Sequence, residues 1–79
     1  MSFKEVAAQV LEGLGGAENI KEMEPCVTRL RVELHDPGKL DEGKLRAAGA
    51  HGVMKMGTVV QVVMGTQSDN IEQAIRELM

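Results

Sequence analysis

The sequence predicts an α+β domain in which a four-stranded, mainly antiparallel sheet carries helices on one face, in the order α-β-β-α-β-β-α. Two observations indicate this fold: apolar residues recur at helical spacing near both ends of the chain, and several segments between them alternate or run apolar as strands do. The 79 residues match the length of one small domain and show neither a repeat nor a linker. We therefore expect residues 1–79 to form a single domain.

Helices are expected at the two ends of the chain. The first covers residues 2–14, where Ser2 and Glu5 form the pattern of a capping box. The last begins at Ser68 or Asp69, either of which can act as its N-cap. Each helix has an apolar stripe, which comprises Phe3, Val6, Ala7, Val10, Leu11 and Leu14 in the first and Ile71, Ala74, Ile75 and Leu78 in the last.

Two strands are expected in the first half of the chain. A short strand over residues 19–23 ends at Pro25, because proline lacks a backbone donor and constrains the residue before it. Apolar and polar residues then alternate over residues 28–34, which is typical of a strand with one buried and one wet face. Arg29 and Arg31 share the wet face, about 7 Å apart by the rise of two strand residues.

A short helix and two further strands are expected in the second half. The helix covers residues 42–48, with Asp41 as its N-cap. The strands cover residues 53–56 and 58–64, and the second is so uniformly apolar that we expect it in the middle of the sheet.

Composition and charge disfavour several classes of function. The net charge is −3, the nine basic residues are scattered and aromatic residues supply 1% of the chain, whereas nucleic-acid binding favours a basic face or stacking aromatics. The single cysteine cannot form an internal disulfide, and no cysteine and histidine spacing indicates a metal or another cofactor. With no apolar run typical of a signal peptide or membrane span, these features predict a cytoplasmic protein.

The segment EPCVTRLRVEL, residues 24–34, holds the cysteine, Cys26, close to the two arginines. A thiol attacks as its thiolate, which nearby cations and backbone N–H groups stabilise. Cys26 is expected to lie on a turn after Pro25, where the N–H groups of Val27 and Thr28 lack obvious ladder partners, and consecutive amides of this kind can bind an anion. Guanidinium groups suit phosphate or carboxylate through paired hydrogen bonds. The segment therefore predicts a thiolate that carries or attacks an anionic group.

Other interpretations of this segment remain open at this stage. A lone cysteine is commonly a buried core residue, and arginines on a strand face are commonly just solvated, so a non-enzymatic regulatory or ligand-binding module is the main alternative. Glu33 can pair with either arginine, and Glu24 opposes the thiolate. A cysteine-phosphatase loop is rejected because its C-x5-R pattern requires arginine where Val32 stands. A redox sensor is disfavoured by the lack of a resolving cysteine. His35 and His51 are expected in surface loops.

The segment CVTRLRVEL, preceded by GLGGAENIKEME and followed by GVMKMGTVVQVVMGTQSDNI, resembles the enzyme IIB domain of the bacterial sugar phosphotransferase system. The similarity is greatest to its glucose, glucoside and N-acetylglucosamine branch. It extends in order and spacing from about Leu11 to Ile75, and the C-x-T-R-L-R pattern is specific when it follows L-G-G-x-x-N-I. Gln61 and Gly65-Thr66 also match. The family fold, a four-stranded antiparallel sheet with helices on one side, agrees with the prediction above.

The resemblance implies a phosphotransferase in which Cys26 accepts a phosphoryl group from a phosphohistidine on a IIA partner and passes it to a sugar held by the membrane permease IIC. It implies that Arg29 and Arg31 are the basic residues of the site, with Arg31 needed chiefly for transfer to the sugar. It further implies that Thr28 and the amides of Val27 and Thr28 bind the phosphate. A monomer on the inner face of the membrane, associated through IIC, is expected. Because a serine of the chain caps its first helix, we also expect a separately encoded subunit.

Overall fold

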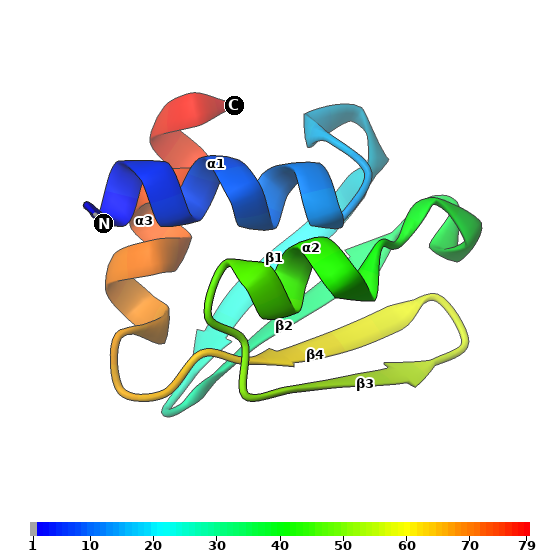
Figure 1. Ribbon diagram of the computed structural model, residues 1–79. Coiled ribbons are helices and arrows are strands. Elements are labelled where there is room, and N and C mark those ends of the chain that lie inside the picture. Colours follow the sequence, from blue (N-terminus) through cyan, green and yellow to red (C-terminus); the bar gives the residue numbers. More distant parts are fainter. Residues whose placement is uncertain (1) are drawn as a thin grey trace.

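In the computed structural model, which describes residues 2–79, three helices cover one face of a four-stranded sheet (Figure 1). The predicted order α-β-β-α-β-β-α and the α+β fold class are confirmed. Two short 3-10 helices, which were not predicted, connect the first helix to the first strand and the second strand to the second helix. The elements are α1 (Phe3–Gly13), η1 (Ala17–Asn19), β1 (Ile20–Cys26), β2 (Arg29–Leu34), η2 (Pro37–Lys39), α2 (Glu42–Ala47), β3 (Gly52–Met56), β4 (Val59–Val63) and α3 (Ser68–Leu78).

All neighbouring strands pair antiparallel, in the order β1-β2-β4-β3. The apolar strand β4 is therefore an inner strand, as predicted, and β1 and β3 are the edges. Alternation along β2 buries Leu30 and Val32 beneath the helices and leaves Arg29 and Arg31 exposed on the opposite side. None of the helices within residues 2–79 covers that side, which we call the open face.

The core between helices and sheet is aliphatic. Phe3, the one aromatic residue of the chain, is 45% exposed, so Leu, Val, Ile, Ala and Met supply the buried apolar surface. The buried apolar residues are Ala7, Val10, Leu14, Met23, Leu30, Val32, Leu34, Leu45, Ala48, Ala50, Val60, Val62, Met64, Ile71 and Ile75.

The helix caps agree with the sequence at two of three places. The Ser2 hydroxyl accepts a hydrogen bond from the Glu5 N–H (3.3 Å), and the Asp41 carboxylate accepts one from Lys44 (3.1 Å). The predicted cap of the last helix is wrong. Ser68 is the first helical residue and is fully buried, and its hydroxyl donates to the Gly65 carbonyl (2.8 Å), which fixes the preceding loop instead of capping the helix.

The prediction that Pro25 ends the first strand is also wrong, because β1 continues through Pro25 to Cys26. The Thr28 carbonyl accepts a hydrogen bond from Met64 and so faces β4, and by alternation the backbone of Leu30 faces β4 as well. Since Leu30 is the ladder partner of Pro25, this pair makes no hydrogen bonds between β1 and β2. The proline nitrogen points to the outer edge of the sheet, where a backbone N–H would have no partner strand to donate to.

Asn19 connects three parts of the fold through its buried side chain, which is 3% exposed. Its amide nitrogen donates to the carbonyls of Leu14 (2.8 Å) and Asp36 (2.9 Å), and its oxygen accepts from the Asp36 N–H (2.8 Å). Gly15 has a φ of +99°, and a Cβ there would lie 2.6 Å from the Asn19 amide nitrogen. The L-G-G-x-x-N pattern is therefore scaffold: it joins the end of α1 to the connection after β2.

Candidate functional site

Cys26 is the last residue of β1 and is exposed. The two-residue loop Val27-Thr28 follows it, so the expectation that the cysteine lies in the turn itself is wrong by one position. Arg29, the first residue of β2, is its direct ladder partner, and residues opposite each other in a ladder project to the same face. The thiol and this arginine are thus neighbours on the open face. An exposed thiol also counts against the alternative of a buried structural cysteine.

The hairpin loop holds Val27 in an unusual conformation. Its φ is +43°, which two-residue hairpin loops require at their first position but which β-branched residues rarely adopt. The left-handed region costs an L-residue about 1–2 kcal/mol. The Val27 side chain is 86% exposed, so the short loop, not burial, imposes this conformation. Backbone strain of this kind is typical of functional sites.

The same loop presents two backbone donors next to the thiol. The Thr28 carbonyl accepts from Met64 (3.0 Å) and Gly65 (2.9 Å), which ties the loop to the segment between β4 and α3. Among residues 2–79, no backbone hydrogen bond is donated by the N–H of Val27 or Thr28. Both amides can therefore donate to an anion bound at the end of the hairpin.

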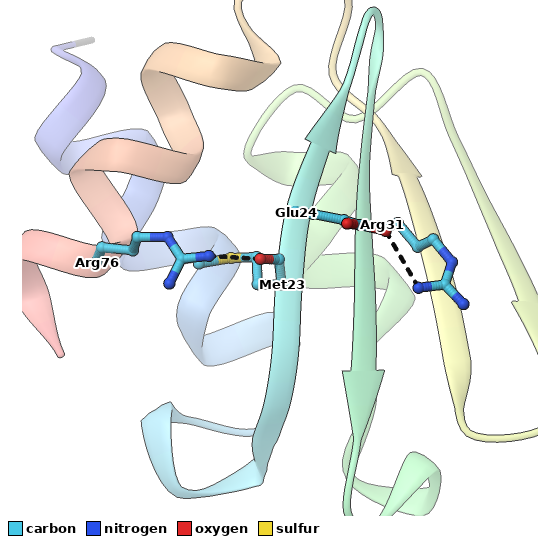
Figure 2. A network of polar contacts seen from close by, with 4 residues as sticks. All are labelled: Met23, Glu24, Arg31 and Arg76. Carbon is cyan, nitrogen blue, oxygen red and sulfur yellow. Dashed lines mark hydrogen bonds and ion pairs between the residues drawn. The ribbon is translucent and has the colours of Figure 1, made fainter.

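The two arginines lie in successive rows of the open face and have different partners. The Arg29 Nη1 donates to the Gln61 Oε1 (2.8 Å), which is a neutral acceptor on β4. The Arg31 Nη1 lies 3.3 Å from the Glu24 Oε1 and forms an ion pair with it (Figure 2). Glu33, which the sequence allowed as a partner of either arginine, instead accepts from the Thr58 hydroxyl (3.4 Å).

The sequence placed Glu24 near the thiol and matched Gln61 to the family, but it paired neither residue with an arginine. A signal for Gln61 existed, because it is the one polar residue of the strand VVQVV and alternation aligns it with Arg31 in the ladder. Glu24 gave no such signal, because a strand that ended before Pro25 would leave it unpaired. The observed register puts Glu24 directly opposite Arg31.

A cleft of about 340 Å³ lies at the edge strand β1, against its residues 21–24 and also against Arg31 of β2 and Arg76 of α3. Arg76 of α3 reaches this edge and donates to the Met23 carbonyl, while the Glu24 side chain leaves β1 in the opposite direction toward Arg31 (Figure 2). Covering an outward carbonyl protects an edge strand from pairing with another chain. The cleft is lined by Lys21, Glu22, Met23, Glu24, Arg31 and Arg76.

His35 and His51 are both exposed, as predicted. Within residues 2–79, no three His, Cys, Asp or Glu side chains are placed to hold a metal ion. None of the helices formed by these residues combines the length and apolar character needed to cross a membrane.

Comparison with known proteins identifies relatives over nearly the whole chain. The profile of the family described as phosphotransferase system, EIIB, matches residues 8–41. The chain is 53% identical over 73 residues to the N-acetylglucosamine-specific EIIB component of a PTS system from Streptomyces coelicolor. The aligned residues cover 92% of this chain and 95% of that protein. It is 40% identical over 79 residues to the glucoside-specific EIICBA component of Staphylococcus carnosus, of which it spans 11%.

A solved structure supports the same assignment. The crystal structure of one domain of the PTS system IIabc component from Clostridium difficile superposes with a TM-score of 0.81 at 27% identity, over 98% of this chain and 81% of that one. The relative from Streptomyces coelicolor matches in sequence along nearly its full length, and the solved domain matches in fold. This chain therefore belongs to the EIIB components of the sugar phosphotransferase system.

Proposed function

We propose that this chain is a phosphocarrier that accepts a phosphoryl group on Cys26 from a phosphohistidine of a IIA partner and delivers it to a sugar bound by the IIC permease. EIIB components are phosphotransferase domains, and relatives named EIICBA combine the three components in one chain. The observation that carries the proposal is the exposed Cys26 thiol directly opposite Arg29 on the open face. A large partner can reach this face without rearrangement of the fold.

The proposed reaction has two transfers. In the first, the Cys26 thiolate attacks phosphorus, an S–P bond forms, and the N–P bond breaks with its electron pair returning to the imidazole of the donor. In the second, a sugar hydroxyl oxygen attacks phosphorus, an O–P bond forms and the hydroxyl proton passes to solvent, while the S–P bond breaks with its electron pair returning to sulfur as the thiolate. Phosphoryl transfer depends mainly on positioning and charge stabilisation, which is what this site can provide.

Each site residue then has a distinct part. The N–H groups of Val27 and Thr28 bind phosphoryl oxygens at the end of the hairpin, and the Thr28 hydroxyl can add a further hydrogen bond. Arg29, held by the neutral Gln61, retains its full charge and faces the phosphocysteine in both transfers. Arg31 serves chiefly the transfer to sugar.

The partners and setting follow from this role. The domain formed by residues 1–79 would work in the cytoplasm as a monomer, at the inner face of the membrane through IIC, and would reach sugar only through IIC. Since a relative of 53% identity is named as N-acetylglucosamine-specific, that sugar is the first to test. The alternative of a regulatory module with a structural cysteine is disfavoured by the exposure of Cys26.

Phosphorylation of the protein tests the proposal directly. The wild-type protein is incubated with phosphoenolpyruvate, the two general phosphotransferase proteins and a IIA, and its intact mass is measured. We expect an added phosphoryl group that fragmentation locates on Cys26 and that is absent without phosphoenolpyruvate. If several IIA proteins that phosphorylate other IIB domains leave this one unmodified, the proposed function is wrong.

The second prediction concerns Arg31. An Arg31→Lys variant should accept a phosphoryl group from IIA at a near-normal rate, but its rate of sugar phosphorylation with IIC membranes should fall about tenfold or more. The reason is that the lysine ammonium is a point charge, whereas the arginine guanidinium can donate two parallel hydrogen bonds to the phosphoryl group. The control is Arg46→Lys, an exposed arginine of α2 outside the group that surrounds Cys26. Equal sugar phosphorylation by the Arg31 and Arg46 variants would refute a special role for Arg31 in delivery.

A further inference from the structure

The two arginines of the open face are equivalent in sequence pattern but not in charge environment. Arg29 is bound by an amide oxygen, which leaves its positive charge uncompensated. Arg31 is paired with a carboxylate, whose negative charge offsets its own. Glu24 is the direct ladder partner of Arg31 and stands two residues before Cys26 on the same face of β1. The resting site therefore has one available cation and one that is already occupied.

The pair between Glu24 and Arg31 is built to open easily. The two side chains are 65% and 44% exposed, and exposed ion pairs of this kind contribute little to stability because water and salt screen them. A phosphoryl group on Cys26 carries more charge than a carboxylate and offers three strong acceptor oxygens. It can therefore compete with Glu24 for the same guanidinium group.

Building on the proposed function, we propose that Glu24 is a positioning residue: a displaceable counter-ion that holds Arg31 in the resting protein and releases it to the phosphoryl group on Cys26. Free phosphate then meets mainly Arg29 and binds weakly, whereas phosphocysteine, which is fixed in place, recruits Arg31 as well. Opening the Glu24–Arg31 pair offsets part of this gain. The phosphocysteine is thereby kept from becoming too stable to pass its group onward.

Glu22 provides a matched control for Glu24. It is exposed, lies on the same strand and face of β1, and is separated from Glu24 by one residue. Its ladder partner, however, is Glu33 and not an arginine. The substitutions Glu22→Gln and Glu24→Gln therefore remove the same charge from the same face, but only the second frees a guanidinium group.

In the first test, inorganic phosphate is titrated into the protein alone, and binding is measured from the change in the NMR chemical shift of the Thr28 amide. We expect Glu24→Gln to bind phosphate about threefold to tenfold more tightly than wild type, Glu22→Gln to differ by less than about twofold, and Glu24→Asp to resemble wild type. In an Arg31→Gln background, Glu24→Gln should have no effect. Equal effects of the two Gln variants, an effect that persists without Arg31, or no measurable binding by Glu24→Gln would each overturn the proposal.

The second test measures the equilibrium of phosphoryl exchange with a IIA partner in the absence of sugar. Glu24→Gln should shift it toward the phosphorylated form by a similar factor, and Glu22→Gln should not. If no variant is phosphorylated while Glu24→Gln still binds phosphate more tightly through Arg31, the proposed function fails and control of Arg31 by Glu24 stands. If both Gln variants are phosphorylated to the same extent as wild type, the function stands and the role of Glu24 fails.

Discussion

A Cys26→Ser variant is expected to accept no phosphoryl group from any IIA donor while keeping its fold. A serine hydroxyl is not ionised near neutral pH and needs a base to attack phosphorus. Arg29 and Arg31, on the facing strand, are permanent cations that cannot take a proton. Because residue 26 is exposed at the end of a hairpin, the free energy of unfolding should change by less than about 0.5 kcal/mol.

Intact mass after incubation with phosphoenolpyruvate, the general proteins and IIA measures this loss, and urea unfolding measures the stability. Alkylated wild-type protein is an independent control, since Cys26 is the one thiol of the chain and its modification should have the same effect. A phosphoryl group found in the serine variant on His35 or His51 would show that another residue is the acceptor.

The largest effect on stability is expected for Asn19→Ala, which should lower the free energy of unfolding by about 3 kcal/mol. The substitution leaves the Leu14 carbonyl and both backbone groups of Asp36 without their partner, and each loss costs about 1 kcal/mol or more. A domain of this size has a total stability of only about 4–12 kcal/mol. The variant should therefore be partly unfolded at temperatures at which the wild type is native.

Denaturant unfolding followed by circular dichroism checks this prediction. Asn70→Ala is the control, because Asn70 is exposed at the start of α3 and its side chain donates to the side chain of the exposed Gln67 (3.1 Å), whereas that of Asn19 bonds to backbone groups. We expect the control to change stability by less than about 0.5 kcal/mol. Similar destabilisation by both substitutions would mean that the hydrogen bonds of Asn19 do not hold the end of α1 to the segment after β2.

Features that depend on spacing within one segment could be predicted from the sequence. The apolar stripe of α1 and the cap at Ser2 are local, and so is the alternation of β2 that buries Leu30 and exposes Arg29 and Arg31 on one face. The apolar character of β4 was enough to place it inside the sheet. The motif around Cys26 led to the correct family because its residues are close together in the chain.

Features that depend on pairing between segments were decided by the tertiary structure. Pro25 is compatible with β1 only because that strand is an edge and its partner there, Leu30, directs its backbone to β4. The same register sets Glu24 against Arg31, and the packing of β4 on β2 brings Gln61 to Arg29. One arginine is thereby paired with a carboxylate and the other with a neutral amide. No local pattern predicts this difference, because the partners of each arginine lie on neighbouring strands that are distant in the sequence.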